Sequence, residues 1–166
     1  GDFMASNQMS RMVGKLSSLP AGMQQWAQTF LLGKVVPFLG TAGMQFEQVT
    51  PQRVVVSVAN KRKVQNHIKG IHAAAMALLA ETATGFVVGM NLPDDKLPLL
   101  KSMKINYVRR SSGDMRAVAE LTPQQVQSIL NDEKGEVTVS VKVTDAANEQ
   151  PIECEMIWAW VPKKRN

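Results

Sequence analysis

The chain has 166 residues, 45% of them hydrophobic, which is the size and composition of one globular domain with a single core. Its one cysteine, Cys154, excludes an internal disulfide and a cysteine-based zinc site, and it suits a reducing compartment. Because no N-terminal run resembles a secretion signal, we expect a cytoplasmic protein. The net charge of +5 indicates an anionic partner, and a phosphate-bearing small molecule fits at least as well as nucleic acid, because the basic runs carry no interleaved aromatic residues for stacking.

Two amphipathic helices are predicted over residues 5–33, separated at Leu19-Pro20. In both, apolar residues recur at the i, i+3, i+4, i+7 spacing of one helix face. These residues are Met9, Met12, Val13 and Leu16 in the first helix, and Met23, Trp26, Ala27, Phe30 and Leu31 in the second. We expect the two helices to cover an edge or a face of the core, as an N-terminal helical extension over residues 1–41. The alternative is that they dock a partner or line a pocket.

Strands follow the extension. Met44 and Phe46 alternate with polar residues, and Val54, Val56 and Val58 form a second, β-branched alternation after a turn. Residues 60–69 are polar and basic, and we expect a loop there.

The stretch from Gly70 to Met90 predicts one long helix that is apolar on every side and therefore buried all round. Only His72 and Glu81 in it ionise near neutral pH, and a buried carboxylate requires compensation for its lost hydration. A membrane span is the rival interpretation. We reject it because a glutamate at mid-span costs roughly 2–3 kcal/mol or more, and because the remaining chain supplies strands that can pack on this helix.

In the second half of the chain, apolar residues alternate with others in four further segments, which predict strands. One short helix is predicted over residues 123–130, with an N-cap residue before it and a proline at its first position. The strand segments are 103–107, 115–121, 137–143 and 152–160. Two strands, a buried helix and four strands predict an α+β fold in which a curved, mostly antiparallel sheet wraps around one long central helix.

The pattern Asn66-x5-His72-x8-Glu81, followed by Ile105-Asn106-Tyr107 and Gly113-Asp114, resembles the hotdog-fold acyl-CoA thioesterases, in particular those of the phenylacetate type. The resemblance covers residues 42–162, and we assign residues 42–166 to a hotdog domain. Ala73 stands where the family usually has glycine, and Glu81 where aspartate is commoner. The resemblance implies active sites at a dimer interface.

Thioester hydrolysis requires a base or nucleophile and donors for the developing oxyanion. We assign the first role to Glu81, oxyanion donation to the N–H of Ala73, and orientation of water or substrate to Asn66 and His72. A purely structural role, with the Glu81 carboxylate bonded to Thr82, Thr84 or an interface partner, is the alternative; for His72 it is a capping or packing role. Ala73 and Glu81 lie about 12 Å apart along one helix, so that two helices of a homodimer, or of a homotetramer, are needed to complete a site.

We expect Arg62, Lys63, Arg109 and Arg110 to bind the phosphates of coenzyme A, or an acyl-carrier protein. Coenzyme A enters only as part of the substrate, and no metal or other cofactor is expected. Two alternatives stay open. One is a non-catalytic acyl-CoA binding protein, and the other is a hydroxyacyl dehydratase that uses His67 and Glu81.

Overall fold

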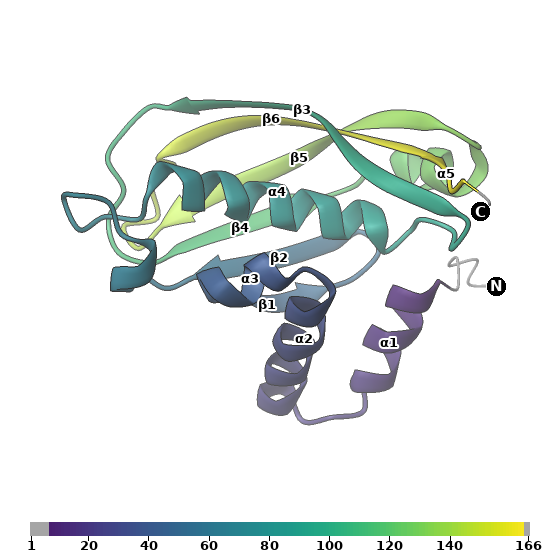
Figure 1. Cartoon of the computed structure of the whole chain (residues 1–166), viewed down its shortest axis with the longest axis horizontal. Coiled ribbons are helices and arrows are strands. Elements are labelled where there is room, and N and C mark those ends of the chain that lie inside the picture. Colours follow the sequence, from purple (N-terminus) through teal and green to yellow (C-terminus); the bar gives the residue numbers. More distant parts are fainter. Residues whose placement is uncertain (1–6, 165–166) are drawn as a thin grey trace.

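The predicted central helix lies against one face of a single antiparallel sheet (Figure 1). A computed structural model describes residues 7–164. Its six strands have the order β1-β2-β4-β5-β6-β3, and every neighbouring pair is antiparallel. The strands and the central helix are β1 Met44–Val49, β2 Arg53–Val58, α4 Ala73–Gly89, β3 Lys96–Tyr107, β4 Met115–Glu120, β5 Gly135–Asp145 and β6 Ile152–Pro162. The α+β architecture expected from the sequence is confirmed.

The core lies between α4 and the inner face of the sheet. Leu79, Ala83 and Val87 of the helix are fully buried, and so are alternate residues of the strands, as the period-2 pattern predicted. The short helix α5, Pro123–Asn131, begins at a capping box on Thr122, as expected.

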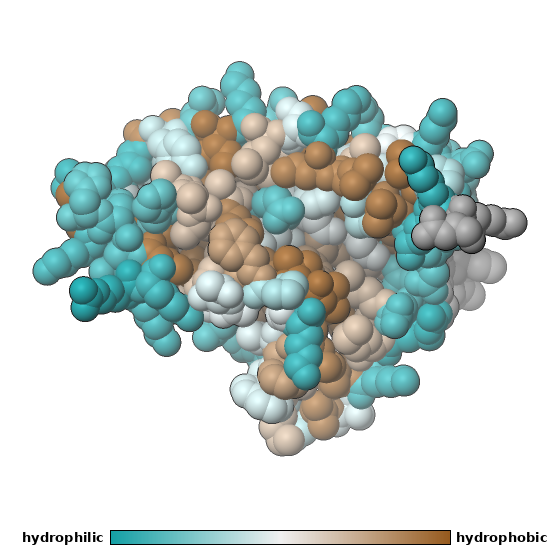
Figure 2. Space-filling view, in the orientation of Figure 1, coloured by the Kyte–Doolittle hydropathy of each residue, from teal (hydrophilic) through white to brown (hydrophobic). Residues whose placement is uncertain are grey.

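The outer side of α4 is the part that the sequence did not predict correctly. We expected burial all round, but Ala74 is exposed and a stripe including Ala77, Glu81, Gly85 and Gly89 is only half-buried. The sheet covers one side of the helix, and the small side chains of this stripe leave the other side accessible. Figure 2 shows apolar side chains gathered on this face of the molecule.

The chain runs from α4 to the far edge of the sheet, where β3 pairs only with β6. The strand begins at Lys96, seven residues before the predicted segment, and it has a bulge between Leu100 and Ser102. Pro98 hid this half from the pattern, because proline breaks a strand signal but is tolerated at a sheet edge.

The N-terminal residues form three helices, not two: α1 Gln8–Leu16, α2 Ala21–Val35 and α3 Pro37–Ala42. The start of the first predicted helix, residues 5 and 6, lies outside the described residues. The predicted face of α1 is confirmed, since Val13 is buried and Met9 partly buried. The expected boundary between residues 41 and 42 falls at the end of α3.

The predicted apolar face of α2 is wrong. Trp26 is 70% exposed and Phe30 50%, and the two rings stack on each other with centroids 5.6 Å apart. The buried face is formed by Ala27, Gln28 and Leu32. The helix carries apolar residues on two sides, and it docks the side that fits against β1, where Thr29 accepts a hydrogen bond from the Phe46 N–H at 3.0 Å. Among residues 7–164 there is no helix with the length and apolar character needed to cross a membrane.

Candidate active site

Glu81 lies on the open side of α4, where neighbouring apolar groups exclude part of its hydration. This burial raises the pKa of the Glu81 carboxyl above its usual value. Within residues 7–164 no group donates a hydrogen bond to the carboxylate. A bond from the carboxylate to Thr82 or Thr84 is not supported, because the Thr84 hydroxyl donates to backbone carbonyls and the Thr82 hydroxyl has no described partner. Glu81 is therefore a half-buried carboxylate without a hydrogen-bond partner among the described residues.

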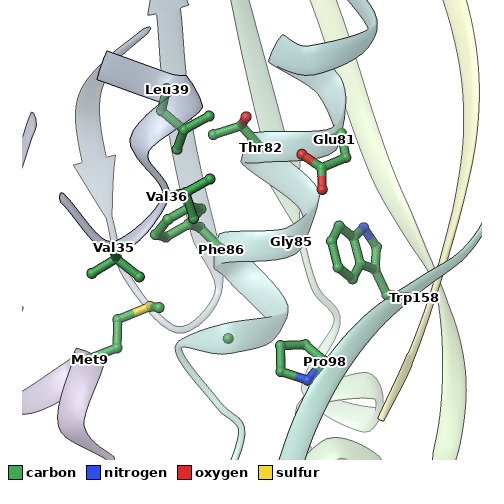
Figure 3. Close-up of a pocket in the computed structure, with 11 residues that line it drawn as sticks. Met9, Val35, Val36, Leu39, Glu81, Thr82, Gly85, Phe86, Pro98 and Trp158 are labelled. Carbon is green, nitrogen blue, oxygen red and sulfur yellow. The ribbon is translucent and has the colours of Figure 1, made fainter. Parts of the chain in front are cut away.

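An apolar cavity of about 190 Å³ adjoins Glu81 (Figure 3). It lies between the outer side of α4, the N-terminal helices and the edge of the sheet. Glu81 is the one ionisable residue among those that line it. The others are Met9, Val35, Val36, Leu39, Thr82, Gly85, Phe86, Gly89, Pro98 and Trp158. Such a cavity favours an apolar ligand placed next to the carboxylate.

A second pocket, of about 370 Å³, lies at the other end of the helix, between its start, the preceding loop and the segment that follows β3. It brings together four of the residues expected in the site: Asn66, Ala73, Arg109 and Arg110. The remaining lining residues are Asn60, Ile68, Lys69, Gly70, Met76, Tyr107, Ser111 and Gly113. We call it the loop pocket.

Asn66 shapes the loop that forms this pocket. Its side-chain oxygen accepts hydrogen bonds from the backbone N–H groups of Ile68 and Gly70, both at 3.0 Å. The turn explains why asparagine is suited to this position. Because the oxygen is used within the loop, the amide nitrogen of Asn66 is the group left to contact a ligand.

His72 is the N-cap of α4. Its Nδ1 accepts the N–H of Ala74 at 2.9 Å, which satisfies one of the free donors of the first helical turn. The side chain is exposed and lines neither pocket, so the geometry favours the capping role over contact with the substrate. His67 is also exposed and lines neither pocket.

Ala73 is the first residue of α4, and the N–H groups of that turn have no acceptor within the helix. Its carbonyl accepts the Tyr107 hydroxyl at 2.8 Å, which ties the end of β3 to the start of the helix. We had not assigned Tyr107 to the site, although it belongs to the Ile105-Asn106-Tyr107 segment that carries the family resemblance. A tyrosine hydroxyl is protonated at neutral pH and can donate this bond, and burial raises the pKa of the Tyr107 hydroxyl further.

The structure divides the expected basic residues into two groups. Arg109 and Arg110 line the loop pocket, and Arg109 also forms an ion pair with Glu149, with 2.6 Å between Nη1 and Oε2. Arg62 and Lys63 lie on the 3₁₀ turn η1, Arg62–Val64, and line neither pocket. The geometry therefore supports a binding role for the arginine pair alone.

The carboxylate and the loop pocket are not brought together within one chain. The eight residues from Ala73 to Glu81 correspond to about 12 Å of helix, and the residues lining the two cavities do not overlap. The N-terminal helices also line the cavity beside Glu81, in agreement with the pocket-lining alternative for these helices. Which cavity they line depends on packing between distant segments and was not predicted.

One long helix held by a six-stranded antiparallel sheet of this strand order defines a hotdog-fold protein, and solved structures share the arrangement. A Pseudomonas aeruginosa protein of unknown function and probable thioesterase matches with a TM-score of 0.73 and 21% identity, over 87% of this chain and 97% of that one. A Haemophilus influenzae thioesterase matches at 0.66 and 12% identity, over 81% and 90%, and a mutant Staphylococcus aureus thioesterase at 0.65 and 19%, over 76% and 100%.

The chain belongs to the family called domain of unknown function DUF4442, whose model matches residues 24–161. No curated protein matches the sequence.

Proposed function

We propose that this protein is a thioesterase that hydrolyses acyl-CoA to the free acid and coenzyme A, at sites shared between the two chains of a homodimer. The observation that carries the proposal is the position of the Glu81 carboxylate: it is half-buried on the central helix, next to an apolar cavity, and has no described hydrogen-bond partner. The names of the structural neighbours support thioester hydrolysis as the reaction class.

In this mechanism Glu81 takes a proton from a water molecule, whose oxygen attacks the thioester carbonyl carbon. An N–H at the start of the helix stabilises the oxyanion, aided by the helix dipole. When the C–S bond breaks, the protonated Glu81 returns its proton to the departing thiolate. The raised pKa suits both steps, because it makes the carboxylate a stronger base and keeps the proton available. Direct attack by Glu81, which forms an anhydride that water then cleaves, is the alternative.

The loop pocket is where we place the coenzyme A moiety. Arg110 has no described ion pair, and Arg109 shares its charge with Glu149. Replacing both arginines with alanine is expected to raise KM more for acyl-CoA than for an acyl thioester without phosphates. Equal effects on the two substrates would contradict this assignment, and an acyl-carrier protein would then become the substrate to test.

Two features support a homodimer. β3 is a twelve-residue edge strand with exposed Leu97, Leu99 and Met103, and an unpaired edge of this length favours association. The half-buried stripe of α4 lies on the open side of the same fold. A twofold arrangement that places two central helices side by side would bring Glu81 of one chain to the loop pocket of the other.

The test is hydrolysis by Glu81→Gln, which keeps the shape of the side chain but cannot act as a base. We expect kcat to fall by about 100-fold or more, with folding and dimerisation unchanged. Glu133→Gln, at an exposed position that lines neither cavity, is the matched control and is expected to keep full activity. A Glu81→Gln variant that retains turnover would overturn the mechanism.

Complementation tests the shared site. Inactive Glu81→Gln chains mixed with inactive Asn66→Ala chains are expected to regain activity, because each heterodimer contains one site without either change. Heterodimers that form but stay inactive would exclude catalysis between chains. A wild type that binds acyl-CoA and does not hydrolyse it would instead identify a binding protein.

A further inference from the structure

The N-terminal helices form one wall of the cavity beside Glu81. In Figure 3, Met9 of α1, Val35 at the end of α2 and Leu39 of α3 lie across from Phe86 on α4. The facing wall is formed by Pro98 and Trp158. The N-terminal extension is therefore part of the cavity, and the groups that its described residues contribute to the lining are apolar.

This wall is anchored to α4. Asn7 is 3% exposed, and its amide nitrogen donates to the carbonyls of Gly89, at 2.8 Å, and Leu92, at 2.7 Å. The same side chain caps α1 by accepting the N–H of Ser10. The methyl end of the Met9 side chain lies 3.4 Å from where a Cβ on Gly89 would be. These contacts fix the wall at the end of the cavity farthest from Glu81.

The floor of the cavity follows one line along the helix. Glu81, Gly85 and Gly89 are four residues apart and occupy successive turns of the same face, over a length of about 12 Å. The two glycines add no side chains of their own to this line, and Trp158 packs against Gly85 and Met9 against Gly89. The volume of about 190 Å³ accommodates about six groups the size of a water molecule or a methylene, at about 30 Å³ each.

We propose that this cavity binds the acyl chain of the substrate, and that the N-terminal extension makes the enzyme selective for unbranched apolar acyl groups of about six to eight carbons. The inference rests on the proposed function, because the carboxylate that would act on the carbonyl stands at one end of the cavity. An acyl chain that extends from this carbonyl through the cavity, between Trp158 and the N-terminal wall, stops at Met9.

The test compares kcat/KM for straight-chain acyl-CoAs of 4 to 12 carbons. Burying each further methylene is worth about a fourfold increase, so that the octanoyl substrate is expected to exceed the butyryl one by up to about 200-fold. Beyond eight carbons the increase is expected to stop. The ratio of two substrates within one preparation does not depend on the fraction of active enzyme, so a variant that folds poorly still gives a valid result.

Two variants change the cavity in opposite directions. Val35→Phe narrows it and is expected to reduce the octanoyl-to-butyryl ratio at least tenfold, whereas Met23→Phe, at an exposed position elsewhere on α2, leaves the ratio unchanged. Met9→Ala opens the far end and moves the optimum to longer chains, whereas Met12→Ala, which does not line the cavity, does not.

Binding of S-alkyl-CoA thioethers, which cannot be hydrolysed, separates failure of this proposal from failure of the proposed function. If calorimetry shows a chain-length preference that Val35→Phe abolishes, and the protein hydrolyses no acyl-CoA, the acyl-cavity proposal stands and the proposed enzymatic function is overturned. If the protein hydrolyses acyl-CoA with a chain-length profile that neither Val35→Phe nor Met9→Ala changes, the proposed enzymatic function stands and the acyl-cavity proposal is overturned. Absence of both hydrolysis and binding overturns both.

Discussion

Substitution of Gly85 by alanine tests how tightly the central helix packs against the sheet. An alanine Cβ at this position would lie 2.6 Å from Cζ2 and 2.7 Å from Cη2 of Trp158, where about 3.5–4.0 Å is the normal contact distance. The indole ring therefore has to move by about 1 Å. It is buried, and its Nε1 donates to the Thr84 hydroxyl at 2.8 Å, so that the movement also breaks a buried hydrogen bond.

The free-energy costs of this substitution can be compared with its gain. Overpacking costs about 1–3 kcal/mol, and an unpaired buried donor costs about 1–3 kcal/mol. Against these, replacing a helical glycine with alanine gains about 1 kcal/mol. We expect Gly85→Ala to lower the free energy of unfolding by about 1–5 kcal/mol, which corresponds to a fall in Tm of about 2–20 °C for a chain of this size.

Gly14→Ala on α1 is the matched control, because no atom lies within 4 Å of its added Cβ. The propensity gain then acts alone, and stability is expected to rise by up to about 1 kcal/mol. Urea denaturation at one fixed protein concentration measures both variants, since dimerisation would otherwise change the apparent stability.

A double variant makes the reasoning refutable. In a Trp158→Leu background the clash is absent, and the cost of Gly85→Ala is expected to fall below about 1 kcal/mol. If Gly85→Ala is as stable as the wild type, or if its cost persists without Trp158, the packing argument is wrong.

Three further predictions follow from burial. Burial raises the pKa of the Cys154 thiol to about 11 from 9.0, so that its alkylation by iodoacetamide at pH 8 is expected to be about 100-fold slower in the native protein than in the unfolded chain. Thr82→Val removes a buried hydroxyl without a described partner, so it is expected to leave the free energy of unfolding unchanged or to raise it by about 1 kcal/mol. Thr84→Val removes the acceptor of the Trp158 hydrogen bond and is expected to lower the free energy of unfolding by about 1–3 kcal/mol. The reverse order of the two variants in urea denaturation would contradict the assignment. The folded chain holds the Glu81 proton to higher pH than the unfolded chain does, because the pKa of Glu81 is raised on folding. The contribution of Glu81 to stability is therefore present below its usual pKa and is lost as pH rises through the raised pKa. If stability falls with pH equally in Glu81→Gln and in the wild type, Glu81 is excluded as the source of that fall.

The elements that the sequence predicted well are those with one unambiguous pattern. β5 and β6 alternate without interruption, and α4 stands out through its alanine-rich composition. The misassigned elements carried competing signals. α2 has apolar residues on two sides, and periodicity could not indicate that Trp26 and Phe30 would stay exposed while Leu32 is buried. The first half of β3 contains Pro98 and two adjacent leucines, which obscure an edge strand.

The residues of the candidate site also differ in how far the sequence alone could predict them. Glu81 was found because it is the one acidic residue in an apolar helix, and Asn66 and Ala73 because of the spacing shared with a known family. Charge clustering grouped Arg109 and Arg110 with Arg62 as coenzyme A ligands, which stays a prediction. It could not show that only the first two line the loop pocket, because the direction in which a loop presents its side chains is set by the folded chain. The hydrogen bond from Tyr107 to the helix start depends on tertiary packing for the same reason.

The position of β3 at the far edge of the sheet has a consequence for how the chain folds during synthesis. Its partner β6 is the last strand, and the paired residues are 45 to 66 positions apart, from Tyr107 with Ile152 to Lys96 with Pro162. At about 5–20 residues per second, a ribosome needs several seconds to make the intervening segment. During that interval β3 has no strand to pair with, because β6, its single neighbour among the described strands, does not yet exist. The final eleven-residue strand therefore closes the fold, and a nascent chain that stalls before residue 152 leaves an apolar strand open to chaperones or to aggregation.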